Sequence, residues 1–383
     1  MAKSKTQQVR PSNESNQSTG FLTRFIFDSP KYIFIPVSLL LLLMKTGIQY
    51  IPNIGVSQAI ATHPFATNGL FDSDPNGFYQ MWNWLTPFLT YVLHLNSPEN
   101  FLRVHAIFAI GFLLIVILTL FKKFSNETAR TAVIIFLALP VSGSVIFWIT
   151  YDAPSLFLMA LILFVFENRY VVFTLGILLG LQDFEPTVVG FGAVVIALAL
   201  SKGGKESRTS MVKFLAVIAG AFTGRLILVL LFKHWGIQGN SGRLAWLLAN
   251  YHDLLKHVSA FDLVLWSVLG FSWIILALMP IANQKITASL AIPLLLLSLL
   301  TFSTDDKTRV MAVATFPLLT VLWLLNADFL GAFNKKLTTA IFSIWILVPW
   351  IFIWQGSAYF STFFGNVQGF NGTLNTLKIL FGL

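Results

Sequence analysis

TDDKTR, residues 304–309, lies between two apolar runs of the chain, residues 286–302 and 310–325. Each run has nearly the length, about 20 apolar residues, that a helix needs to cross a bilayer. Unpaired charges in lipid cost several kcal/mol each, so two acidic and two basic side chains between such runs indicate a membrane face or a wet cavity. The rest of the sequence indicates which face this is and which other ionisable groups share it.

The composition is that of a membrane protein. Hydrophobic residues make up 56% of the 383 residues and charged residues 11%, and the mean hydropathy is +0.76. A soluble domain has charge on about a quarter of its residues, so we predict an all-α polytopic membrane protein. The net charge of +9 fits Lys and Arg retained in cytoplasmic loops, and we expect membrane lipids and no nucleic acid as partners. The absence of Cys excludes disulfides and thiolate metal sites.

The apolar runs predict about eleven transmembrane helices, the last at residues 337–354. Basic residues before residue 32 and in alternate loops place the N-terminus in the cytoplasm and the tail from residue 355 outside. Three consecutive runs, residues 153–166, 170–181 and 187–200, are short for a bilayer. They predict either a water-filled outer recess or helices packed within the protein. Two outer loops are expected to contain amphipathic interfacial helices, at residues 78–95 and within 236–260.

The predicted domain organisation is simple. Residues 1–30, of which the first twenty or so are rich in Ser, Asn and Gln, predict a disordered cytoplasmic N-terminus. Residues 31–383 predict a single transmembrane domain with compact loops, which favours a bacterial inner membrane.

The predicted topology collects ionisable residues on the outer face, and Arg225 alone is expected deep within a span. A transporter more often concentrates charge near the bilayer midplane, so clustering on one side favours an enzyme with an outward-facing cleft. The clustered residues come from different loops and are Asp72, Asp74, Asp152, Asp183, Glu185, Asp305, Asp306, Lys307 and Arg309.

Four stretches in this order resemble the GT-C glycosyltransferases, polytopic enzymes that use polyprenyl-phosphate sugars as donors. Asp72-Ser-Asp74 resembles their acidic motif in the first outer loop. Residues 129–164 resemble their third and fourth spans, 171–191 the following Gly-rich pair, and 305–319 (DDKTRVMAVATFPLL) the late loop with a basic residue before a Pro-containing span. The resemblance covers residues 30–325. It implies sugar transfer from a lipid phosphate carrier to a lipid or glycan acceptor at the non-cytoplasmic face, which in a bacterial inner membrane is the periplasm.

Inverting sugar transfer requires a carboxylate base for the acceptor hydroxyl and cations for the leaving phosphate. We predict Asp74 as the base and Asp72 as second choice or helper, although Asp74-Pro-Asn-Gly is also typical of a solvated turn. Arg309, supported by Lys307, is predicted to bind the donor phosphate, and the alternative is an Arg that snorkels from a helix end. Arg225 is either a second phosphate ligand or the buried partner of an acidic residue.

Four further carboxylates are candidates for the outer cleft. Asp305 and Asp306 are expected to hold Arg309 in place or to contact sugar hydroxyls. Asp152 and Glu185 each stand shortly before a Pro at the start of an apolar run, so helix capping is the alternative to a place in the cleft.

No cofactor is implied, and a divalent metal on Asp72 and Asp74 stays open. His252 and His257 are five residues apart, which is not the spacing of a metal pair on one helix face. Two other function classes also stay open. A lipid-linked polysaccharide polymerase or ligase has similar spans but more often Arg-rich outer loops. A lipid or solute transporter requires access from both faces.

Overall fold

The computed structural model describes residues 20–48, 82–95, 97–201, 205–235, 261–278, 284–299, 304, 306–354, 357–361 and 369–382. The described part is mostly helical, with seventeen α-helices and one two-stranded antiparallel sheet. This confirms the helical class predicted from composition.

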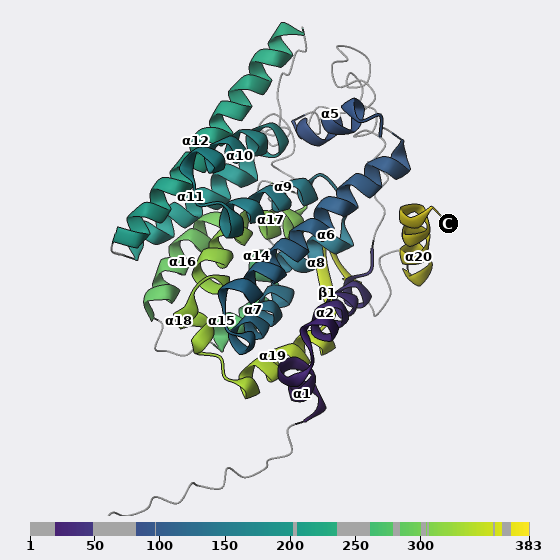
Figure 1. Cartoon of the computed structure of the whole chain (residues 1–383), viewed down its shortest axis with the longest axis vertical. Helices are drawn as coiled ribbons and strands as arrows, with labels where there is room; N and C mark the ends of the chain where they lie inside the picture. The colour runs from purple at the N-terminus through teal and green to yellow at the C-terminus, as the bar shows by residue number, and fades with distance from the viewer. Residues whose placement is uncertain are drawn as a thin grey trace, which may run out of the picture.

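The central element is α17 (Lys307–Leu319), which continues as the π-helix η5 (Thr320–Leu324). It begins within the charged stretch and passes through the core, where its hydrophobic side chains from Met311 to Leu319 are almost all fully buried. Figure 1 shows α17 surrounded by other elements. The elements that pack against it are α8 (Pro140–Phe147), α9 (Asp152–Ala160), α11 (Phe184–Leu200), α14 (Phe261–Leu269), α16 (Gln284–Leu299) and β1 (Trp350–Trp354).

The first half of the chain is dominated by α6 (Pro98–Lys123). The start of α6 has two features that favour a helix N-terminus. Ser97 is the N-cap and accepts a hydrogen bond from the amide of Asn100, and Pro98 occupies the first turn. Ile107, Ile110, Leu114 and Leu118 form an exposed apolar stripe along it, as expected of a helix that faces lipid. It packs against α9, α7 (Asn126–Ala138), the π-helix η1 (Leu161–Val165) and α8. Other elements of this half are α1 (Phe21–Asp28), α2 (Lys31–Thr46) and α5 (Leu85–Val92).

α10 (Arg169–Gln182) and α12 (Lys205–His234) form the closest helix pair. Gly176 and Gly180 of α10 face the backbone carbonyls of Val217 and Ala221, and glycines of α12 face α10 in return. Residue numbers increase in the same direction along both helices, since Gly176 faces Val217 and Gly180 faces Ala221. The two helices therefore run parallel, and α11 connects them. α12 extends beyond its neighbours at the upper left of Figure 1.

The C-terminal part differs from the sequence prediction. The expected last span, residues 337–354, is the helix α19 (Lys335–Leu347) followed by β1, which pairs with β2 (Ser357–Ser361) so that Phe352 faces Tyr359. The helix ends because Val348 precedes a Pro, which disfavours the helical conformation, and Val348 is extended. The remaining elements are α15 (Ser272–Ala277), α18 (Ala327–Gly331) and α20 (Gly369–Phe381).

The number of spans is also corrected. Within the described residues, three helices are long and apolar enough to cross a membrane, Glu99–Lys123, Ser207–His234 and Lys307–Leu324. The pair α7 and α8, bent by 60°, is a fourth if it counts as one span. The figure of eleven was too high because several of the predicted spans form helices shorter than a bilayer, such as Asp152–Val165 and Arg169–Gln182.

The predicted interfacial and disordered segments are described only in part. Of the expected helix at 78–95, the described part contains α5, with Thr86, Pro87 and Thr90 buried and Val92 exposed. Residues 236–260 lie outside the described residues. Of the N-terminal segment predicted to be disordered, residues 21–28 form α1, with Ile26 fully buried.

Three segments that the sequence predicts on one side of the membrane lie together at one end of the structure. α1 lies beside α19 at the foot of Figure 1, where Thr23 and Thr339 hydroxyls are 3.2 Å apart. Lys335 at the start of α19 pairs with Glu127 at the start of α7, at 3.3 Å. The buried Arg130 of α7 donates to carbonyls of Ile26 and Ser29 and so closes the C-terminal end of α1.

Candidate functional site

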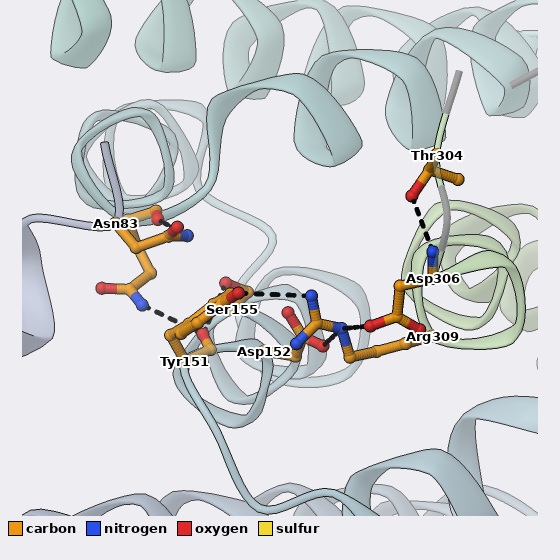
Figure 2. A network of polar contacts seen from close by, with 8 residues as sticks. Asn83, Tyr151, Asp152, Ser155, Thr304, Asp306 and Arg309 are labelled. Carbon is orange, nitrogen blue, oxygen red and sulfur yellow. Dashed lines mark hydrogen bonds and ion pairs between the residues drawn. The ribbon is translucent and has the colours of Figure 1, made fainter. Parts of the chain in front are cut away.

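An ion-pair cluster joins the start of α9 to the start of α17 (Figure 2). The Nε atom of Arg309 lies 3.0 Å from Oδ2 of Asp152 and 2.8 Å from Oδ2 of Asp306. The three side chains are only 10–14% exposed. Two carboxylates and one guanidinium are therefore held together with little access to bulk water, where their interaction is stronger than at an open surface.

The helix starts position these groups. Asp306 is the N-cap residue of α17, and Arg309 follows on the first turn, so the two side chains lie on one face. Asp152 is the first residue of α9, where a negative charge is favourable to the helix dipole. Asp152 is not the N-cap, which is Tyr151, and no side chain caps this end. The capping alternative for Asp152 is therefore wrong, and its carboxylate faces Arg309.

Two aromatic rings border the guanidinium. Tyr151 accepts a hydrogen bond from Nη2 of Arg309 at 3.2 Å, and its ring centre lies 5.0 Å from Cζ of Arg309. The ring of Trp148 lies 5.7 Å from the same atom. Both distances are within the range of cation–π attraction. Burial raises the pKa of Tyr151 while Arg309 opposes the shift, so the phenol is neutral at physiological pH.

Gln182 fixes the turn that carries Tyr151. It is fully buried, and its Nε2 donates to the carbonyl of Tyr151 at 3.0 Å while its Oε1 accepts from the amide and hydroxyl of Thr86. Asn83 donates to the carbonyl of Gln182 at 2.6 Å. The segment that follows the first outer loop is thus tied to the turn beside Arg309. The sequence analysis did not identify Gln182 as a site residue. A polar amide at the end of an otherwise apolar, Gly-rich helix is a pattern that could have indicated a buried hydrogen-bonding role.

Lys307 lies on the same turn of α17 as Arg309, and its side chain has a backbone partner. Its side chain is almost completely buried, and its Nζ donates to the carbonyl of Thr304 at 3.1 Å. The described structure therefore places the Lys307 ammonium against the backbone that leads into α17. There it stabilises the position of the charged stretch.

Arg225 and Glu185 form a second pair. Nη2 of Arg225 is 3.5 Å from Oε1 of Glu185, and its guanidinium lies 3.5 Å from the ring centre of Trp82. Arg225 therefore has an acidic partner, as the alternative predicted, in a pair that is only partly buried, with side chains 19% and 35% exposed. Glu185 follows the N-cap Asp183 of α11 within the first helical turn, so it is not the cap residue.

The remaining candidates lie outside the described residues. These are Asp72, Asp74, Asp305, His252 and His257. Among the residues that the structure does describe, no group of three or more His, Asp or Glu side chains could hold a metal ion.

No protein-family model, curated protein or solved structure matches this chain. The chemistry of the cluster around Arg309 is therefore the basis for the functional assignment.

Proposed function

We propose that this chain is a membrane-embedded glycosyltransferase that transfers a sugar from a polyprenyl-phosphate donor to a lipid or glycan acceptor. The observation that supports this most is the meeting of Arg309 with Asp152 and Asp306 across two helix starts distant in sequence. The resemblance of four sequence stretches to GT-C enzymes, two of which contain the residues of this cluster, also supports it.

The reaction needs the groups that this cluster and the predicted first outer loop contain. The acceptor hydroxyl gives its proton to a carboxylate and its oxygen forms a bond to the anomeric carbon, while the bond from that carbon to the phosphate oxygen breaks. The electron pair leaves with the polyprenyl phosphate, whose growing charge a cation stabilises. Arg309 is the proposed cation, Asp74 the proposed base, and Asp72 and Asp152 the next candidates for the base.

The aromatic rings around Arg309 support the same role. Trp148 and Tyr151 shield the guanidinium from water, so its attraction to an anionic oxygen is less screened than at an open surface. The proposal places this cluster on the periplasmic side of a bacterial inner membrane, with the N-terminus in the cytoplasm.

A transfer assay tests the proposal. Purified protein is incubated with a panel of radiolabelled polyprenyl-phosphate sugars and crude lipid or glycan acceptors, beside the variants Asp74→Asn and Asp152→Asn. We expect turnover by the wild type and its loss in Asp74→Asn. If Asp74→Asn retains turnover and Asp152→Asn loses it, Asp152 and not Asp74 is the base.

A matched control is available at the opposite end of the fold. Glu127→Gln removes a carboxylate from the exposed pair with Lys335 and is expected to leave turnover unchanged. Absence of turnover with every donor, alongside tight binding of lipid-linked glycan, would contradict the transferase and favour a polymerase or a flippase.

A further inference from the structure

Tyr151 has a proton with no acceptor in the described part of the protein. Its oxygen accepts from Nη2 of Arg309 at 3.2 Å, so the phenol still has its own O–H to donate. No described residue accepts that hydrogen bond. Tyr151 is only partly exposed, so a ligand oxygen placed beside Arg309 would satisfy this donor.

The turn that carries Tyr151 is held in place by the protein before any ligand binds. The carbonyl of Tyr151 accepts from Nε2 of Gln182 at 3.0 Å and from the hydroxyl of Ser155 at 3.2 Å. Figure 2 shows the ring of Tyr151 directed at Arg309, with Asp152 and Asp306 on the other sides of the guanidinium. The O–H and the guanidinium therefore form a preorganised pair of donors, which need little rearrangement to bind.

The chemistry of the pair selects the ligand. A guanidinium beside a neutral O–H donor suits an oxygen that is negatively charged, since such hydrogen bonds are about twice as strong as those between neutral groups. A lipid-linked donor with a neutral sugar contains such oxygens only in its phosphate. We propose that the hydroxyl of Tyr151 donates a hydrogen bond to the phosphate of the donor lipid while Arg309 binds the same group. This inference rests on the proposed function and adds the residue that recognises the phosphate with Arg309.

Binding of citronellyl phosphate, a short prenyl phosphate, tests the inference without the transfer reaction. Its dissociation constant is measured by calorimetry on the full chain in detergent, beside that of citronellol, which has the same tail and no phosphate. Tyr151→Phe removes only the hydroxyl. We expect it to weaken binding of citronellyl phosphate about tenfold and to leave binding of citronellol unchanged.

Tyr170→Phe is a closely matched control. Tyr170 is exposed and also accepts a hydrogen bond from an arginine, Nη2 of Arg169 at 3.0 Å, with its ring centre 4.9 Å from the guanidinium. This variant should bind both compounds as the wild type does. Equal phosphate affinity in Tyr151→Phe and the wild type would overturn the inference, and so would a wild type that does not bind citronellyl phosphate.

A second measurement needs no variant. Replacing tyrosine with 3-fluorotyrosine makes each phenol a stronger donor, so binding of citronellyl phosphate should tighten while citronellol binding stays constant. Unchanged phosphate binding would overturn the inference even if Tyr151→Phe failed to fold. Phosphate binding that depends on Tyr151, without turnover of any sugar donor, would support the inference and contradict the transferase.

Discussion

At the scale of single residues, Arg309 neutralises two carboxylates that have little contact with water. The side chains of Asp152 and Asp306 are 10% and 14% exposed, and removing the cation leaves both charges without this partner. Truncating one member of such a group costs about 3–5 kcal/mol, because the remaining charge stays desolvated.

We therefore predict that Arg309→Met lowers the free energy of unfolding by several kcal/mol. The control is Lys335→Met, which breaks a pair whose side chains are 51% and 56% exposed and whose contribution is at most about 1 kcal/mol. Chemical denaturation in detergent compares the two. If both variants lose a similar free energy of unfolding, the buried ion pairs of Arg309 contribute no more to stability than the exposed pair of Lys335, which would contradict the prediction.

At the scale of elements, the packing of α10 on α12 depends on glycine. A Cβ atom at Gly180 would lie 2.1 Å from the carbonyl oxygen of Ala221, so the backbones would have to separate. Such overpacking typically costs about 1–3 kcal/mol. Because α10 ends at Gln182, a shift of this helix would also displace the turn that holds Tyr151.

Gly180→Ala is accordingly expected to lower the thermal stability and to weaken binding of citronellyl phosphate. Gly192 of α11 has open space where its Cβ would lie, so Gly192→Ala should be neutral or stabilise by up to about 1 kcal/mol through helix propensity. Melting curves of the two variants compare their thermal stabilities. A Gly180→Ala protein as stable as Gly192→Ala would contradict the tight packing of these helices.

At the scale of the whole molecule, the chain has two opposite ends. One contains Glu127 and the starts of α7 and α19, and it is cytoplasmic under the proposed orientation. The other contains the Arg309 cluster, against which the β1–β2 hairpin packs through Ile353, whose amide donates to Thr308.

Because the chain has no Cys, single cysteines can report these sides without background. Glu127 and Ser357 are both exposed. In sealed right-side-out vesicles, a membrane-impermeant maleimide should label Ser357→Cys and spare Glu127→Cys until the vesicles are opened. Labelling of both residues before opening, or of Glu127→Cys alone, would contradict the orientation.

Features of the fold that depend on local sequence patterns were predicted correctly. The helical class, the start of α17 in the charged stretch and the start of α9 at Asp152 follow from apolar runs and their flanking charges. The membrane topology also indicated that Asp152 and Asp306 would share a face with Arg309, and the three side chains do meet.

Other features depend on tertiary contacts that no local pattern contains. The run Trp350–Trp354 is as apolar as a span, and its pairing with Ser357–Ser361 decides that it is a strand. The role of Gln182 arises because α5, α10 and the start of α9 meet at one buried amide. Apolar runs also do not show where a helix bends or ends, so helices shorter than a bilayer were counted as spans.

The central claim is that the Arg309 cluster is the reaction centre of a sugar transferase. The most direct measurement is the initial rate of sugar transfer from the polyprenyl-phosphate donor by Arg309→Lys, beside Lys335→Arg as the control that exchanges the same two residue types. Lysine keeps the charge but loses the planar donors, so we predict a fall in kcat/KM of about 100-fold or more in Arg309→Lys and none in Lys335→Arg. A folded Arg309→Lys protein that transfers sugar at the wild-type rate would contradict the claim.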